Sequence, residues 1–190
     1  DTGRWQVQRI KGGALKARLA FVEERMGAEA LARVLGRVTE GERHELGGLL
    51  ATKWYPLTLQ LCLDEAIAAE AGGAREQVFR QLGAASAERN LTGAHRDFLA
   101  PGDPLAFLER VPLVYSFYYD QGRRTFEKLS ANEGRITTYD APHVSAEDCL
   151  TICGWYTKAL EMCGAKAARV VEEECRARGG KVCRYRVSWS

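Results

Sequence analysis

The stretch "VVEEECRARGGKVCRYRV", residues 170–187, lies close to the C-terminus and decides how the last part of the chain folds. Three glutamates precede Cys175, and Cys175 and Cys183 lie at equal distances from Gly179. A glycine pair between two such runs predicts a β-hairpin over residues 167–189. A three-residue loop at 178–180 would place the two cysteines opposite each other, with Cβ atoms about 4.5–5.5 Å apart.

The cysteine pair has three possible chemistries. A disulfide and a shared metal ion fit the expected separation about equally well, and two inert buried thiols are a third possibility. A closed metal site would need two further ligands. The glutamates at 172–174 and Cys149, near the start of the preceding predicted helix, are candidates, because a helix N-terminus lowers the pKa of a thiol and favours the thiolate.

The rest of the chain predicts mostly helices. Apolar residues at three- and four-residue spacing, together with Gly and Pro breaks, indicate helices over 14–26, 28–38, 40–51, 57–71, 74–90, 105–119 and 145–163. A strand over 4–10 and a hairpin formed by 124–130 and 135–139 complete the pattern. We therefore expect an α+β fold with helices packed on an antiparallel sheet of about four strands, forming one domain over residues 1–190.

Composition narrows the class of protein. The chain has 190 residues, 46% of them hydrophobic and 27% charged, and a formal net charge of +2, as in ordinary globular proteins. Basic and acidic residues are mixed, so we expect no direct contact with nucleic acid. No apolar run has the length of a membrane span, and no leader peptide is visible. We therefore expect a cytoplasmic protein, in which clustered cysteines favour metal over disulfides and the isolated Cys62 is a small buried hydrophobe.

Four positions resemble a known metal site. Cys149, Glu172, Cys175 and Cys183, separated by 23, 3 and 8 positions, are similar to the zinc ligands of the vinyl reductase-type (4-vinyl reductase) sensor domain. That domain occurs in phenol- and toluene-responsive bacterial activators, and it is similar in fold to Bet3-type trafficking subunits and haem nitric-oxide-binding proteins. The resemblance covers nearly the whole chain, and it is most specific in the last 45 residues.

The resemblance implies a Bet3-like ligand-binding fold, a structural zinc ion on those four residues, and a homodimer. Glu173 remains an alternative to Glu172, because side chains alternate along a regular strand and Glu173 shares a face with Cys175. A bulge would be needed to turn Glu172 towards the thiols.

The resemblance also implies a buried cavity for a small apolar or aromatic ligand. The aromatic and histidine side chains expected to line it are Trp54, Tyr55, His95, Phe98, Phe107, Tyr115, Tyr118 and Trp155. Ligand binding would favour one packing of the helices and pass that bias to an attached or partner output module, as in signalling and transcription regulation.

Three other functions remain open at this stage. One is a dimeric protein-interaction scaffold without a small ligand, and another is a reductase-associated protein of tetrapyrrole metabolism. A haem-dependent gas sensor would need a proximal histidine and a Tyr-x-Ser-x-Arg signature, but the signature is absent and the only histidines are His44, His95 and His143. No nucleophile–base pair, phosphate loop or cofactor fingerprint is visible, so we expect no enzyme and no catalytic residue.

Overall fold

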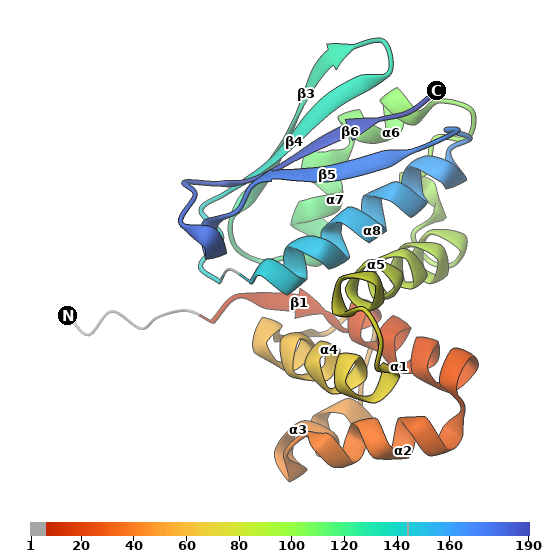
Figure 1. Cartoon of the computed structure of the whole chain (residues 1–190), viewed down its shortest axis with the longest axis vertical. Helices are drawn as coiled ribbons and strands as arrows, with labels where there is room; N and C mark the ends of the chain where they lie inside the picture. Colours follow the sequence, from red (N-terminus) through yellow and green to blue (C-terminus); the bar gives the residue numbers. More distant parts are fainter. Residues whose placement is uncertain (1–6, 144) are drawn as a thin grey trace, which may run out of the picture.

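A computed structural model describes residues 7–143 and 145–190. It has an α+β architecture, which confirms the predicted fold class (Figure 1). A sheet lies at one end of the molecule and a group of helices at the other. Helices α8 (Ala146–Met162) and α5 (Arg75–Thr92) lie side by side between them, and they join the two halves.

The helical half is built from the first part of the chain. It contains α1 (Gly12–Met26), α2 (Ala28–Arg37), α3 (Glu40–Gly47), α4 (Leu57–Ala71) and α5. Helix α4 has the predicted bounds, because Pro56 precedes its first turn and Gly72, at φ 65°, follows its last. Thr39 and Glu42 form a reciprocal capping box that fixes the start of α3.

Two short strands tie the N-terminal segment to the helices. β1 (Arg9–Lys11) pairs antiparallel with β2 (Trp54–Pro56), with Ile10 opposite Tyr55. The strand predicted over 4–10 therefore lies later in the chain, and its first three residues, 4–6, fall outside the described residues. The pairing of residues 9–11 with 54–56 was not predicted, since neither segment is long enough to show an alternating pattern.

The helix predicted over 105–119 is two helices. A 3₁₀ turn, Arg96–Phe98, leads into α6 (Pro104–Glu109), and α7 (Val111–Tyr118) follows after Arg110. Pro112 lies in the first turn of α7, where its missing N–H leaves no hydrogen bond unmade within that helix. The same proline cannot continue the hydrogen-bond ladder of α6, so the chain breaks at Arg110.

The sheet of the second half has four strands in the order β3-β4-β6-β5, all antiparallel. They are β3 (Arg123–Ser130), β4 (Glu133–Tyr139), β5 (Arg169–Glu174) and β6 (Cys183–Ser188). Helix α8 connects β4 to β5, and Ser145 caps its start by accepting a hydrogen bond from the Asp148 backbone N–H, as the sequence predicted.

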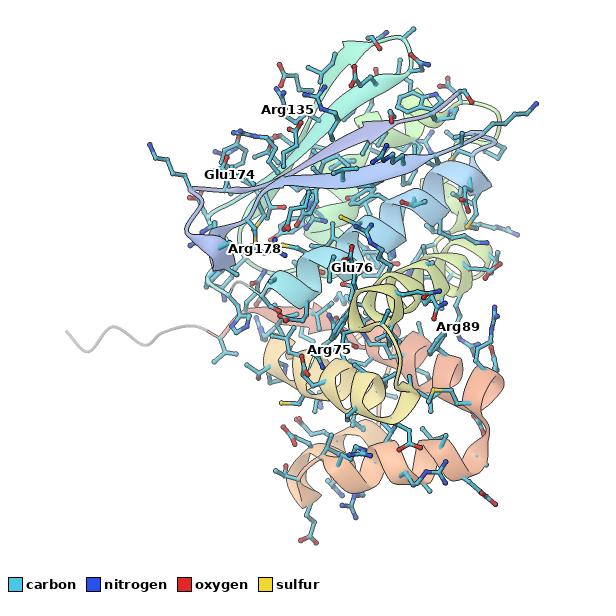
Figure 2. The ribbon with its side chains drawn as sticks, viewed as in Figure 1. Arg75, Glu76, Arg89, Arg135, Glu174 and Arg178 are labelled. Atoms are coloured by element: carbon cyan, nitrogen blue, oxygen red, sulfur yellow. The ribbon has the colours of Figure 1, made fainter. Side chains whose placement is uncertain are left out.

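The last hairpin differs from its prediction in two respects: β5 contains a bulge, and Cys175 lies beyond the end of β5 and forms no strand pair with Cys183. Glu174 pairs with Arg184 in the register that a turn centred on Gly179 requires, but Glu172 pairs with Tyr185, so β5 contains a bulge at Glu173. Strand β5 ends at Glu174, and a 3₁₀ turn over Arg176–Arg178 precedes Gly179, which adopts φ 88°. Figure 2 shows Arg178 on this turn, beyond the sheet.

Two glycines bring α5 and α8 into close contact. A Cβ atom on Gly83 would lie 1.9 Å from the carbonyl oxygen of Thr151, and a Cβ on Gly154 would lie 1.9 Å from that of Arg80. Any side chain at either position would separate the helices. This contact fixes how the helical half sits against the sheet half, and Gly83 and Thr151 both border the pocket described next.

Candidate functional site

A pocket lies between the two halves of the molecule, with a cavity volume of about 50 Å³. Helices α1, α4 and α5 form one wall, and α7, β3 and α8 form the other. We call it the first pocket. It is lined by Ile10, Ala14, Arg18, Gln60, Gly83, Ser86, Val114, Tyr115, Tyr118, Tyr119, Arg124, Thr151, Ile152, Trp155 and Tyr156.

A smaller pocket of about 30 Å³, the second pocket, shares Tyr115, Tyr119, Arg124 and Ile152 with the first. Its other walls bring in polar groups from β4, α8 and the C-terminal hairpin. They include Gln8, Thr138, His143, Asp148, Cys149, Arg176 and Cys183. The two pockets therefore adjoin each other inside the molecule, with Arg124 in the wall of both.

Arg124 is buried, with 6% of the residue exposed. Its Nε donates a hydrogen bond to Thr138 Oγ1 at 2.8 Å and its Nη1 contacts the Tyr156 hydroxyl at 3.5 Å. The guanidinium lies over the ring of Tyr115, 4.7 Å from its centroid. Within the described residues no carboxylate forms an ion pair with it.

Arg18, on the opposite wall, has a full counter-charge. Its Nε lies 2.5 Å from Asp64 Oδ1 and its Nη2 lies 3.1 Å from Oδ2, and both side chains are at most 4% exposed. Burial raises the pKa of Asp64 to about 6, although Arg18 opposes that shift. Asp64 is thus ionised at neutral pH, and the pair is a two-point buried salt bridge.

Two buried amide oxygens have no hydrogen-bond partner in the described structure: Gln60 Oε1 in the first pocket and Gln8 Oε1 in the second. The Gln60 amide nitrogen donates to Asp148 Oδ1 at 3.1 Å, and that same oxygen accepts from the Thr151 hydroxyl at 3.3 Å. Unpaired buried acceptors cost about 1–3 kcal/mol each. The pocket walls therefore present hydrogen-bonding capacity that the protein itself leaves unused.

The tyrosine hydroxyls of the first pocket are neutral. Burial raises the pKa of Tyr118 and Tyr119 well above the ordinary value of 10, and it raises that of Tyr115 in the same direction. The Tyr115 hydroxyl donates to the Gln121 carbonyl oxygen at 2.8 Å and accepts from the Gln8 amide at 3.3 Å. Neutral phenols supply O–H donors and aromatic faces around Arg124.

Three of the predicted ligand-lining residues, Tyr115, Tyr118 and Trp155, line the first pocket. The others do not. Tyr55 packs in the core of the helical half, and Trp54 lies beneath the Lys11 ammonium, 3.8 Å from the ring centroid. His95 and Phe98 pack against Phe117 of α7, and His95 Nδ1 meets the Tyr118 hydroxyl at 2.9 Å. Phe107 is buried in the core of the sheet half, where its ring packs near Trp155 and Tyr156.

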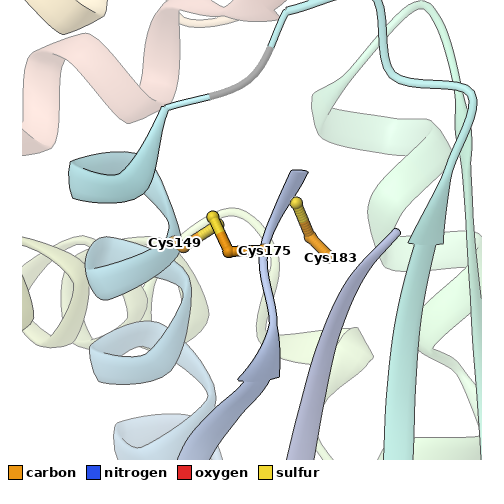
Figure 3. Close-up of side chains that lie close together, drawn as sticks. All are labelled: Cys149, Cys175 and Cys183. Atoms are coloured by element: carbon orange, nitrogen blue, oxygen red, sulfur yellow. The ribbon is translucent and has the colours of Figure 1, made fainter. Parts of the chain in front are cut away.

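The three cysteines that the sequence singled out do meet. Figure 3 shows Cys149 from the first turn of α8, Cys175 from the end of β5 and Cys183 from the start of β6. Their sulfur atoms lie within 4.8 Å of one another, with Cys149 and Cys175 3.8 Å apart, and all three residues are buried. A hydrogen bond with Cys149 lowers the pKa of Cys183 to about 6, and the same hydrogen bond raises that of Cys149.

The bulge in β5 separates the two candidate glutamates. Glu172 is 11% exposed, its Oε2 contacts Arg178, and its Oε1 is buried without a partner in the described structure. The negative charge of Glu172 helps to raise the pKa of Cys175. Glu173 faces away and pairs with Arg135 and Arg186 on the outer surface of the sheet. Glu172 is thus the carboxylate beside the thiols.

No local pattern in the sequence marks the polar groups of the pocket. Arg124 follows another arginine at the start of a strand, where both are expected in solvent, and only the fold sends Arg124 inward. Gln60 and Arg18 are single polar residues within α4 and α1, and no local pattern marks either of them as buried. A buried cation without a counter-charge can be recognised only once its neighbours are known.

The fold has well-matched neighbours among solved structures. An H-NOX protein of K. algicida in the unliganded Fe(II) state superposes with a TM-score of 0.72 at 15% identity, and the match covers 95% of this chain and 97% of that one. The H-NOX domain of Shewanella oneidensis in the Fe(II)CO state gives 0.74 at 14% identity, over 95% and 99% of the two chains. At these identities the likeness establishes a shared fold.

Two expectations from the sequence are wrong. The neighbours are H-NOX domains, and neither the structural matches nor the family match supports membership of the vinyl reductase-type or Bet3-like group. The structural zinc ion was implied only by that resemblance, so this expectation is wrong as well. One neighbour, matched with a TM-score of 0.70 at 10% identity, is described by the redox potential of its haem.

Haem itself does not fit the described site. The first pocket has a volume of about 50 Å³, whereas ligand sites for cofactor-sized molecules span roughly 300–1,000 Å³. None of the residues lining the first pocket is a histidine. His143 borders only the second pocket, and His95 is held against Tyr118 and Phe117.

An apolar aromatic ligand is likewise unsupported, because both pockets, at about 50 and 30 Å³, are smaller than the roughly 150 Å³ of an apolar cavity that binds benzene.

Within the described residues, no helix is long and apolar enough to cross a membrane.

No curated protein matches the chain. A family model described as "Protein of unknown function (DUF2378)" matches residues 12–190, which include every element from α1 to β6 and all the residues of the first pocket except Ile10. With nearly its full length covered by that model, the chain belongs to the DUF2378 family.

Proposed function

We propose that this domain is a small-molecule sensor that binds its ligand in the first pocket without haem. The observation that carries the proposal is that the pocket is lined from both halves of the molecule, by α1, α4 and α5 on one side and by α7, β3 and α8 on the other. A ligand there contacts both halves and favours one packing of α5 against α8. An attached or partner module would receive that change.

The lining supports a polar ligand. Arg124, Gln60 and four tyrosines surround a volume of about 50 Å³, enough for a small molecule. No catalytic residue is assigned, since the proposal requires only differential binding. The expected homodimer remains a prediction that size-exclusion chromatography with light scattering would check.

A melting-curve screen tests the sensor proposal. The probes are a defined library of polar molecules with up to six heavy atoms. We expect at least one to raise the melting temperature of the wild type in a saturable way, because a ligand that binds only the folded state stabilises it. Val114→Phe, which fills the pocket, should abolish the rise, whereas Leu113→Phe, on the exposed side of α7, should keep it. No saturable hit, or equal hits in both variants, would contradict a sensor pocket.

We also propose that Cys149, Cys175 and Cys183, with Glu172, form a metal site. Support comes from three buried sulfurs within 4.8 Å of one another and a buried carboxylate oxygen without a partner in the described structure. The site would join α8 to both strands of the C-terminal hairpin, so an ion there would stabilise the sheet half.

Elemental analysis of the purified protein tests the metal site and identifies its ion. Cys183→Ser should lose the metal and part of the melting temperature. Cys153→Ser, one helical turn from Cys149 and outside the three-thiol cluster, should keep the metal. Less than about one-tenth of an equivalent in the wild type, purified under reducing conditions without chelators, would contradict the assignment.

A further inference from the structure

Arg124 is a buried cation that forms no ion pair with any carboxylate of the described residues. Its neighbours are Thr138, Tyr156 and the faces of Tyr115 and Tyr119, at 4.7 and 5.9 Å from the ring centroids. All of these groups are uncharged. An arginine side chain remains protonated in proteins, so the charge cannot be removed by titration.

The aromatic contacts cannot fully replace a counter-ion. A cation–π contact contributes about 0.5–2 kcal/mol, whereas burying an unpaired charge costs several kcal/mol. The same protein buries Arg18 only together with a carboxylate at two-point hydrogen-bonding distance. The positive charge at the shared wall of the two pockets therefore favours an anion in one of them.

Other residues of the two pockets supply hydrogen-bond acceptors. Gln60 Oε1 and Gln8 Oε1 are acceptors without a partner in the described structure. The carboxylate of Asp148 borders the second pocket and holds Gln60 through its amide nitrogen. A simple anion such as chloride would leave these acceptors unpaired and would lie near a carboxylate. A ligand with a donor group at its other end would pair with them.

Size restricts the ligand further. The volumes of about 50 and 30 Å³ are well below the roughly 150 Å³ of a cavity that binds benzene. Phosphorylated metabolites, aromatic acids and nucleotides are too large for the described walls. A two- or three-carbon acid is the size that remains.

We propose that the pocket binds a small carboxylate with a hydroxyl or amino group on its second carbon, the carboxylate on Arg124 and the donor group towards Gln60 and Asp148. This inference rests on the proposed sensor function and names the class of its ligand. The Tyr156 hydroxyl, which lies beside Arg124 Nη1, supplies a further donor to the carboxylate.

Matched ligands test the two ends separately on the wild-type protein. Glycolate and glycine carry both groups, acetate lacks the donor, and ethylene glycol lacks the charge. At about 100 times the dissociation constant, a ligand of the folded state should raise the melting temperature by roughly 5–10 °C. We expect glycolate or glycine to do so, acetate to bind at least about 10-fold more weakly, and ethylene glycol to have no effect. Equal affinity for acetate and glycolate, or binding of ethylene glycol alone, would overturn the ligand class.

Substitutions at position 124 test whether Arg124 binds the carboxylate of the ligand. Arg124→Met should weaken glycolate or glycine binding at least about 10-fold, since a hydrogen bond to a charged group contributes about 1.5–3 kcal/mol. Arg123→Gln, the exposed neighbour on β3, should leave binding unchanged. If Arg124→Met does not fold, Arg124→Lys keeps the charge without the two-point geometry and should bind more weakly than the wild type. Unchanged binding in the folded Arg124 variant would overturn the proposal.

The two proposals can fail separately. If neutral library molecules bind the first pocket and no small acid does, the ligand class is wrong and the sensor function stands. If neither binds, both are wrong.

Discussion

The two walls of the first pocket each contain a buried arginine, but only one of these arginines has a carboxylate partner among the described residues. In the helical half, Arg18 meets Asp64 through two hydrogen bonds, and the pair is complete without any ligand. In the sheet half, Arg124 has only neutral partners among the described residues. The first arginine is a structural group, and the second has the properties of a binding group. The predictions below test that difference.

The largest effect is expected for Arg18→Met. The substitution leaves the Asp64 carboxylate buried without a partner, and breaking a buried pair in this way costs about 3–5 kcal/mol. Urea unfolding of the variant at neutral pH measures the loss in free energy of unfolding. A loss below about 1 kcal/mol would remove the structural role assigned to Arg18.

The second-largest effect on stability is expected at the close contact between α5 and α8, which holds the two walls together. Gly83→Ala places a methyl group where the Thr151 carbonyl oxygen now lies, so α5 and α8 must move apart. We expect a cost of about 1–3 kcal/mol, as for other overpacked sites. Gly36→Ala, on α2, is the control, because a Cβ there meets no atom within 4 Å and alanine favours the helix. Equal stabilisation by both substitutions would show that the helices are not in close contact.

Titration of Asp64 gives a comparable effect with a definite pH range. Its pKa is about 6 in the folded protein and about 3.9 in an unfolded chain, so between pH 4 and 6 the folded state binds the proton more tightly. Its contribution to stability is therefore fully present below about pH 4 and is lost as the pH rises through 6. The wild type should lose on the order of 1–3 kcal/mol relative to Asp64→Asn between pH 4 and 7, measured by urea unfolding. A pH-independent difference would place the pKa of Asp64 at its unfolded value.

The smallest effect on stability is expected for Arg124→Met in the absence of ligand. No carboxylate is left without a partner, and replacing a buried charge with an apolar side chain of similar length is often neutral. We expect a loss of no more than about 1 kcal/mol or a gain in stability, because the substitution removes an unpaired buried charge; the exposed control Arg123→Gln should change stability by less than about 0.5 kcal/mol. A loss as large as that of Arg18→Met would show that Arg124 is mainly structural.

Much of the fold follows from local sequence signals. Pro56 and Gly72 fix the ends of α4, Ser145 fixes the start of α8, and Gly179 centres the last hairpin, and each acts through its own backbone geometry. The break at Arg110 depends on Pro112, and the pattern of apolar residues alone gave one helix there. The pairing of β1 with β2 depends on contacts between distant segments, which local patterns do not encode.

The candidate sites divide in the same way. The meeting of Cys149, Cys175 and Cys183 could be predicted, because two of them are related by the hairpin and the third by the helix before it. The relatives of the fold and the cofactor could not be predicted, because unrelated metal sites share a short spacing of cysteines and a glutamate. The role of Arg124 was invisible because Arg123 and Arg124 look alike in sequence and differ only in which face of β3 carries them.

Calorimetric titration of glycolate into the wild type and into Arg124→Met tests the central claim most directly. The account predicts saturable binding with one site per chain in the wild type and at least about 10-fold weaker binding in the variant. Glycine, titrated in the same way, covers the amino form of the ligand. Identical titrations in the two proteins, or no heat from either ligand in the wild type, would contradict the assignment of Arg124 as a binding group.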